Sequence, residues 1–148
     1  MTPKMRKKIL DLMKIHQLMT IATVRPDGYP QATTVTCAND GLNLYFSCDG
    51  ASQTVRNIGR NRKVSLAIDR DSEDWNPIRG RSLGGTAQVV KDRQEFQRAL
   101  RLMTKKYPQM AELGEEDMKG MAIVKVTPKV FSVLDYARGF GHTDLVRA

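Results

Sequence analysis

The chain has 148 residues, the length of one ordinary domain and enough to bury a core without disulfides or metals. Hydrophobic residues make up 41% of it and charged residues 27%, values near the average for soluble proteins, which exclude extended disorder. No apolar run approaches the roughly 20 residues of a membrane-spanning helix. We therefore predict a single domain over residues 1–148 with no membrane partner. The net charge of +8 favours an anionic partner.

An amphipathic helix is predicted at the N-terminus, where Thr2 is a typical N-cap and Pro3 suits the first turn. The residues of one face recur at helical spacing: Met5, Ile9, Leu12, Met13 and His16. Basic residues ahead of this segment resemble the start of a signal peptide. However, Asp11 and Lys14 interrupt the apolar stretch and no small-residue cleavage site follows, so we expect a cytoplasmic protein.

Three strands are predicted next, at residues 20–25, 31–38 and 42–47, with turns at 26–28 and 39–41 between them. This pattern is typical of a β-meander with two hairpins. In the second hairpin Ala38 would face Leu42, and Cys48 would fall opposite Ala32. Cys37 would then lie about 17 Å from Cys48, beyond the roughly 7 Å limit for a disulfide. We predict no disulfide, and the cysteines and histidines have no zinc-ligand spacing.

The rest of the chain alternates between helix and strand signals. Ser52 can cap a short helix with Val55 and Ile58 facing inward, and alternation at residues 64–68 predicts a strand. A longer strand is predicted over residues 78–91, with a bulge at 84–85. Asp92 and Glu95 then form a capping-box pattern for a helix that extends to about residue 107.

Two strands are predicted at the C-terminal end, over residues 122–126 and 130–136, with Pro128 as a break between them and a glycine-rich tail after them. Six or seven short strands with about three helices favour a mainly β (α+β) fold. The two early hairpins disfavour parallel pairing in that part of the sheet. We expect an antiparallel barrel closed partly by helices, not a doubly wound α/β sheet.

The sharpest candidate site is the predicted helix start at residues 52–57. Free backbone N–H groups, two hydroxyls and Arg56 would together bind an anion such as a phosphate monoester. The alternative is that Ser52 is only a cap and Arg56 a surface residue. Residues 33–37 offer hydroxyls along one strand, although ordinary strand propensity explains them equally well.

Trp75 and the two histidines are further candidates for the site. Trp75 is more typical of packing than of a ligand platform, and His16 is typical of a core or interface histidine. His142 lies in the glycine-rich tail near Tyr136 and Phe140. There it either belongs to an aromatic lid over a site or lies in a disordered terminus.

The chain resembles the FMN-binding split-barrel proteins related to pyridoxamine 5'-phosphate oxidase. The resemblance covers about residues 10–135 and depends on several short segments in a fixed order. These are residues 21–32, 44–47, 52–58, 61–66, 85–87 and 126–128. It implies an antiparallel split β-barrel with flanking helices, and a homodimer with two FMN molecules at the subunit interface.

The resemblance also implies roles for particular residues. The FMN phosphate would contact Ser52, Gln53, Thr54 and either Arg56 or Arg62. The flavin ring would lie against Thr33, Thr34, Val35 and Thr36, with Ser47 and Cys48 near the ribityl chain. Arg79 and Arg81 would approach the polar edge of the ring, and the partner's C-terminal tail would cover it. No catalytic residue is assigned.

One departure from the family concerns Thr54, where many relatives carry lysine, so we expect weaker FMN binding. Deazaflavin F420 and haem, which other members of the superfamily bind, are the alternative cofactors. Since true pyridoxamine-phosphate oxidases have a longer C-terminal extension, we do not predict vitamin B6 oxidation.

The favoured function is an FMN-dependent oxidoreductase that passes electrons from NAD(P)H or another reductant to a small organic acceptor. The first alternative is a protein that binds or senses flavin or haem without turnover. A basic nucleic-acid-binding barrel is less favoured. Aromatic residues make up only 6% of the chain and do not interleave with the basic clusters as stacking platforms would.

Overall fold

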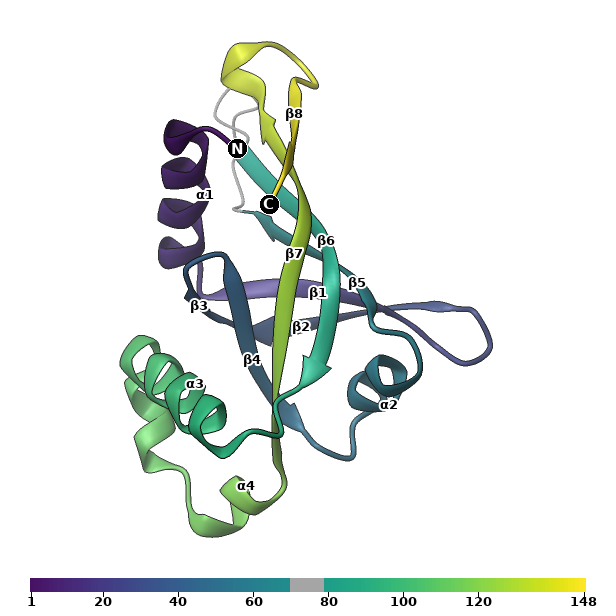
Figure 1. Cartoon of the computed structure of the whole chain (residues 1–148), viewed down its shortest axis with the longest axis vertical. Helices are drawn as coiled ribbons and strands as arrows, with labels where there is room; N and C mark the ends of the chain where they lie inside the picture. The colour runs from purple at the N-terminus through teal and green to yellow at the C-terminus, as the bar shows by residue number, and fades with distance from the viewer. Residues whose placement is uncertain (70–78) are drawn as a thin grey trace.

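The computed structural model describes residues 1–69 and 79–148. Within these ranges eight strands form one antiparallel sheet, in the order β2-β1-β5-β6-β7-β4-β3 with β8 beside β7. The strands are β1 Leu18–Val24, β2 Pro30–Thr36, β3 Ala38–Asp40, β4 Asn43–Asp49, β5 Lys63–Asp69, β6 Arg79–Val89, β7 Met121–Asp135 and β8 Thr143–Arg147. The sheet curls into a half-closed barrel, in which β1 and β2 cross β6 and β7 (Figure 1). This confirms the predicted mainly β, antiparallel split barrel.

Helices flank the barrel, with α1 along one side and α2 and α3 near the end at which β4 and β6 finish (Figure 1). The helices are α1 Pro3–Ile15, α2 Gln53–Arg60, α3 Arg93–Lys106 and α4 Glu115–Lys119, with 3-10 turns at Pro108–Glu112 and Tyr136–Arg138. The side chains of Thr2, Ser52 and Asp92 each accept an N–H from the first turn of α1, α2 and α3. The predicted caps are confirmed, and no helix in the described ranges is long and apolar enough to span a membrane.

The second predicted hairpin was wrong in register. Ala38 pairs with Tyr45, and Cys48 pairs with Ala122 of β7 instead of lying opposite Ala32. The strand predicted over residues 31–38 is interrupted at Cys37. The segments before and after it, β2 and β3, lie at opposite ends of the sheet order. Local alternation could not reveal this, because it reports which residues face inward but not which strand is the neighbour. Both cysteines are free, as predicted.

The predicted break at Pro128 was also wrong, because β7 runs through it. Pro128 lies opposite Gly85, at the bulge where the β6–β7 register shifts. On the other side of β7, pairing with β4 ends at Val126 and pairing with β8 begins at Val130. No ladder bond is therefore needed from the missing proline N–H. The chain predicted as a tail instead contains β8, which pairs with β7.

The bulge at Gly84/Gly85 was predicted correctly. A Cβ on Gly85 would lie 2.5 Å from the carbonyl oxygen of Thr127 and 3.1 Å from the Cα of Pro128. Only glycine permits this approach of two backbones. The bulge therefore brings β7 close enough to β6 for one strand to continue past the proline.

Two hydrophobic clusters lie on opposite faces of β4. Leu44 and Phe46 point into the barrel, where they meet Ile9 of α1 among other buried residues. Tyr45 points outward and packs with Ala99 of α3. The strand is thus covered on both sides, and successive residues of β4 face different surroundings.

Outside the barrel a polar cluster holds α3 on the sheet. Tyr45 Oη donates to the carboxylate of Glu95 at 2.9 Å, and Lys125 Nζ donates to the same oxygen at 2.7 Å. Glu95 was predicted to complete a capping box. Its backbone N–H is indeed bonded to the Asp92 carboxylate, but its own side chain binds Tyr45 and Lys125.

We predict a tyrosine titration that is displaced to high pH. Burial, followed by the hydrogen bond to and charge of Glu95, raises the pKa of Tyr45 to about 12, against about 10 when unfolded. The contribution of the protonated phenol to the free energy of unfolding is fully present below about pH 10. It is lost as the pH rises toward 12. Phenolate absorbance of the wild type should show a step near pH 12 that Tyr45→Phe lacks. A Tyr45 step near pH 10 would contradict this.

Candidate functional site

The turn from β4 into α2 is built by side-chain bonds to the backbone. The Asp49 carboxylate accepts the Ala51 N–H at 2.8 Å, and its carbonyl accepts the Ser52 N–H at 3.0 Å. Ser52 Oγ then accepts the Val55 N–H at 3.3 Å. Within the described residues, the N–H groups of Gln53 and Thr54 in the first turn have no acceptor. They form the positive end of α2.

Arg56 adds a full positive charge at this helix end. Its Nη1 donates to the carbonyl of Ala51 at 2.5 Å, and its Nη2 donates to Gln53 Oε1 at 2.8 Å. The guanidinium therefore folds back over the start of α2 while its side chain stays exposed. Arg56, Ser52, Gln53 and Thr54 are thus brought together as the sequence predicted.

The inward face of α2 carries a polar network that the sequence analysis missed. Asn57 is fully buried, and its Nδ2 donates to Thr23 Oγ1 at 3.0 Å and to Gln31 Oε1 at 3.3 Å. Gln53 Nε2 donates to Asn57 Oδ1 at 2.7 Å. The network ties α2 to β1 and β2. The i, i+4 spacing of Gln53 and Asn57, together with Thr23 at an inward position of β1, was the signal available.

The candidate residues of β2 separate by face. Gln31 Nε2 donates to Thr33 Oγ1 at 3.3 Å, which joins Thr33 to the polar network of α2, and Val35 is buried on the same side. Thr34 is exposed on the opposite side, and Thr36 is half-buried. Among the described strands only β1 pairs with β2. One edge of β2 is therefore left open beside α2.

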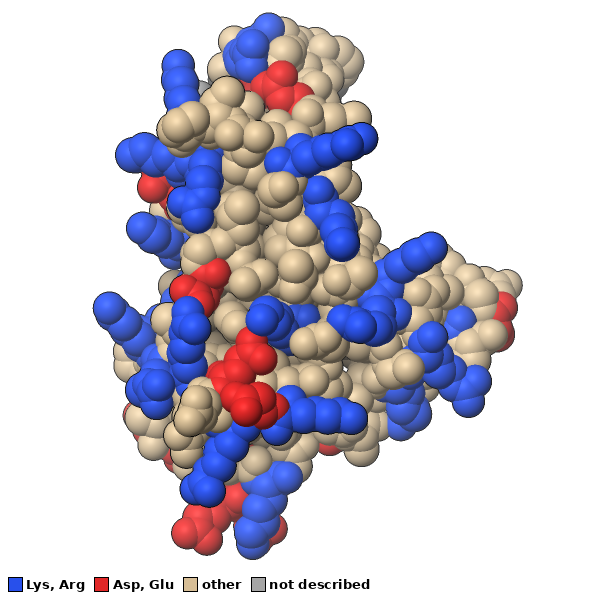
Figure 2. Space-filling model, viewed as in Figure 1, with Lys and Arg blue, Asp and Glu red and all other residues tan. Residues whose placement is uncertain are grey.

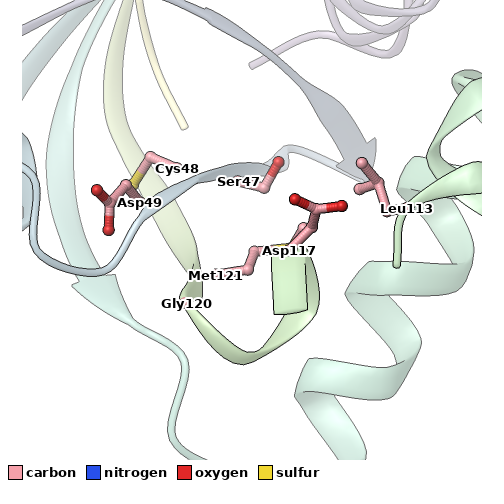
Figure 3. A pocket seen from close by; sticks show the side chains of 7 residues that line it. All are labelled: Ser47, Cys48, Asp49, Leu113, Asp117, Gly120 and Met121. Atoms are coloured by element: carbon pink, nitrogen blue, oxygen red, sulfur yellow. The ribbon is translucent and has the colours of Figure 1, made fainter. Parts of the chain in front are cut away.

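Ser47 and Cys48 also point to different places. Ser52 Oγ donates to Cys48 Sγ at 3.8 Å, so Cys48 lies against the start of α2. Burial raises the pKa of this thiol, more than the Ser52 hydrogen bond lowers it, which keeps it protonated and unreactive at neutral pH. Ser47 and Cys48 both line a cavity of about 450 Å³ together with Asp117 and Met121, and their side chains point in different directions there (Figure 3).

The two arginines of β6 lie at the end of the strand opposite to its contact with Arg62. Arg81 is buried, and its Nη1 donates to the carbonyls of Gly80 and Leu134 at 2.7 and 3.0 Å. The backbone of Arg79 pairs with Asp135. The other end of β6 lies near the end of α2. There the Ala87 N–H donates to the carbonyl of Arg62, which follows the helix. Six residues of strand span about 20 Å from Arg81 to this point.

Arg62 lies beyond the C-terminal end of α2. Its Nε donates to the carbonyl of Ala87 and its Nη2 to Gln88 Oε1. Of the two arginines proposed for a phosphate contact, only Arg56 lies at the correct end of the helix. Trp75 lies outside the described residues.

Both histidines lie apart from the start of α2. His16 is half-buried and caps the C-terminus of α1. His142 precedes β8, with its Nε2 3.3 Å from an Asp144 carboxylate oxygen. In the ranges that the structure describes, no three His, Cys, Asp or Glu side chains gather into a metal-binding group.

The fold matches solved structures over almost the whole chain. A conserved hypothetical protein from Mycobacterium tuberculosis has a TM-score of 0.79 at 22% identity, covering all of this chain and 94% of its own. A heme binding protein from Mycobacterium smegmatis has a TM-score of 0.81 at 17% identity, covering 99% of this chain and 59% of its own.

A third similar structure is a Clostridium acetobutylicum protein of the pyridoxinephosphate oxidase family, described as related to a general stress protein. It has a TM-score of 0.75 at 19% identity and covers 99% of this chain and 96% of its own. No curated protein sequence matches the chain. The family model for pyridoxamine 5'-phosphate oxidase matches residues 5–135. The chain therefore belongs to the pyridoxamine 5'-phosphate oxidase family.

Proposed function

We propose that this protein binds FMN at the start of α2 and uses it to pass electrons from NAD(P)H or another reductant to a small organic acceptor. The observation that supports this most directly is the open first turn of α2 with the Arg56 guanidinium folded over it. A phosphate monoester fits there, because two backbone N–H groups and one cation converge on the same small volume.

The residues present fit FMN with fewer charges than in many relatives. Thr54 stands where those relatives carry lysine, and it is buried at 4% exposure, so the phosphate would depend on Gln53, Thr54 and Arg56. The polar network through Asn57 would fix Gln53 and Thr33 beside the ligand. When bound, FMN would supply reversible electron transfer, and the protein would orient the ring along the open edge of β2.

We also propose that the working form is a homodimer. The resemblance implies that β6 of a second copy lies beside the cofactor, and in its own chain the backbone at Arg81 lies about 20 Å along β6 from the contact of that strand with Arg62. Exposed apolar side chains support a covered surface, with Leu18 at 54% and Tyr29 at 71% exposure beside the open strand. Light scattering on the purified protein should give a mass of two chains. A monomer would contradict this part of the proposal.

Haem is the second candidate, because the similar protein from Mycobacterium smegmatis is a heme binding protein. A haem at the start of α2 would lack a histidine ligand from this chain, since His16 and His142 lie elsewhere. FMN is therefore favoured over haem. Deazaflavin F420 also carries phosphate, and a competition titration against FMN would separate the two.

The proposal is tested by Arg56→Gln. Removing the guanidinium should weaken FMN about tenfold, the effect of one charge-assisted contact, as measured by quenching of flavin fluorescence. Riboflavin lacks the phosphate, so its affinity should not change. Arg60→Gln is the matched control, since Arg60 is exposed on the same helix but outside its first turn. Equal FMN affinity in both variants, or an equal loss for riboflavin, would contradict the phosphate site.

A further inference from the structure

A second cavity lies at the opposite end of α2, where β6 ends and α3 begins. It has a volume of about 460 Å³, within the range of small-molecule sites. Its apolar lining comes from Ile58, Val89 and Val90. Ile58 and Val90 are buried, so this floor is fixed by the barrel. Helix α2 has eight residues and is therefore about 12 Å long, which separates this cavity from the proposed FMN phosphate site.

The acidic side chains at the rim are already engaged by other groups of the protein. The Asp92 carboxylate caps α3 by accepting the Glu95 N–H at 2.8 Å. The Glu95 carboxylate accepts from Lys125 at 2.7 Å and from Tyr45 at 2.9 Å. These contacts hold the pKa of Glu95 below its usual range, so it is an ion paired with Lys125 at neutral pH.

The two basic side chains at the rim are not paired with a carboxylate of the described part of the chain. Within residues 1–69 and 79–148, the side chain of Arg62 donates only to neutral acceptors, the carbonyl of Ala87 at 3.3 Å and the amide oxygen of Gln88 at 2.5 Å. These two bonds orient its guanidinium beside the cavity. Lys91 is exposed and has no acceptor among the residues that the structure describes. Figure 2 shows Lys and Arg side chains spread over much of the face drawn there, with Asp and Glu side chains among them.

We propose that this cavity binds a small organic anion with an apolar body, held by Arg62 and Lys91 above the floor of Ile58, Val89 and Val90. A carboxylate or a phosphate ester would each satisfy the two cations. The site is separate from the FMN site at the other end of α2, and the proposal does not depend on which cofactor the protein uses.

The test uses the full-length protein labelled with ¹⁵N and two probes, benzoate and phenyl phosphate. We expect saturable amide shifts at Gly59, Val90 and Lys91, and the tighter probe identifies the anionic group. Benzyl alcohol, which lacks the charge, should bind at least tenfold more weakly. Shifts confined to Gln53 and Thr54, or equal binding of benzyl alcohol, would overturn the proposal.

Variants then assign the cations. Arg62→Gln and Lys91→Gln should each weaken the tighter probe about tenfold, whereas Arg60→Gln, at the same helix end but outside the cavity lining, should not. Because Arg62 also bonds to residues of β6, the thermal stability of each variant is measured. If Arg62→Gln is destabilised, the result for Lys91→Gln decides the test, since Lys91 is exposed. An unchanged affinity in Lys91→Gln, or an equal loss in Arg60→Gln, would overturn the assignment.

Discussion

Replacing Asn57 with alanine is expected to lower the free energy of unfolding by about 2–4 kcal/mol, the effect of breaking a buried hydrogen-bond network. Asn57 is fully buried and bonds Thr23, Gln31 and Gln53 at once. Truncation leaves buried Thr23 and half-buried Gln31 and Gln53 without their bonds to this side chain and also opens a small cavity. Urea unfolding followed by circular dichroism measures the loss.

The matched control for Asn57→Ala is Arg60→Ala in the same helix. Arg60 is exposed and makes no bond to the barrel among the residues described, so its truncation should change stability by less than about 0.5 kcal/mol. Asn57→Ala should also weaken FMN, because Gln53 loses its anchor. If Asn57→Ala were as stable as the wild type, the network would not hold α2 on the barrel.

Replacing Gly85 with alanine is expected to lower the free energy of unfolding by about 1–3 kcal/mol. The new Cβ would lie 2.5 Å from the Thr127 carbonyl oxygen, and the obstructing atom is backbone, so a rotamer change cannot relieve it. β6 and β7 must separate at the bulge or shift register. Thermal unfolding monitored by circular dichroism measures the loss.

Gly59→Ala is the control, because its expected effect on the free energy of unfolding has the opposite sign. A Cβ on Gly59 would meet nothing within 4 Å, and alanine is favoured over glycine in a helix by about 0.5–1 kcal/mol. This variant should therefore be as stable as the wild type or slightly more stable. Equal stability of Gly85→Ala and Gly59→Ala would show that the close approach at the bulge is not needed.

The helix starts were predictable because their determinants are local. The side chains of Ser52 and Asp92 each accept a hydrogen bond from the backbone N–H three residues further on. Such a cap can be recognised from the sequence. The inward alternation of β5 was predicted for the same reason. The family's motifs, spread over most of the chain, then identified the split barrel that these elements build.

Features that depend on which strands are neighbours were not predictable in this way. Pro128 reads as a break, yet it is tolerated because Gly85 lies across from it and neither β4 nor β8 pairs there. The same limit explains why the strand predicted over residues 31–38 ran past Cys37, and why Asn39 and Asp40 of β3 were predicted as a turn.

The candidate site shows the same division. The cluster of Ser52, Gln53, Thr54 and Arg56 follows from one helix start and was found from sequence. Asn57 was part of that motif, but its role depends on Thr23 and Gln31 in other strands. The opposite directions of Ser47 and Cys48 likewise follow from the position of β4 between the barrel core and α3.

The measurement that tests the central proposal most directly is the visible absorption spectrum of the purified protein, before and after incubation with FMN and gel filtration. We predict a flavin spectrum at one FMN per chain, either as purified or after reconstitution. A protein that stays colourless and retains no flavin would contradict FMN binding at α2. A haem Soret band that resists displacement by FMN would contradict it equally.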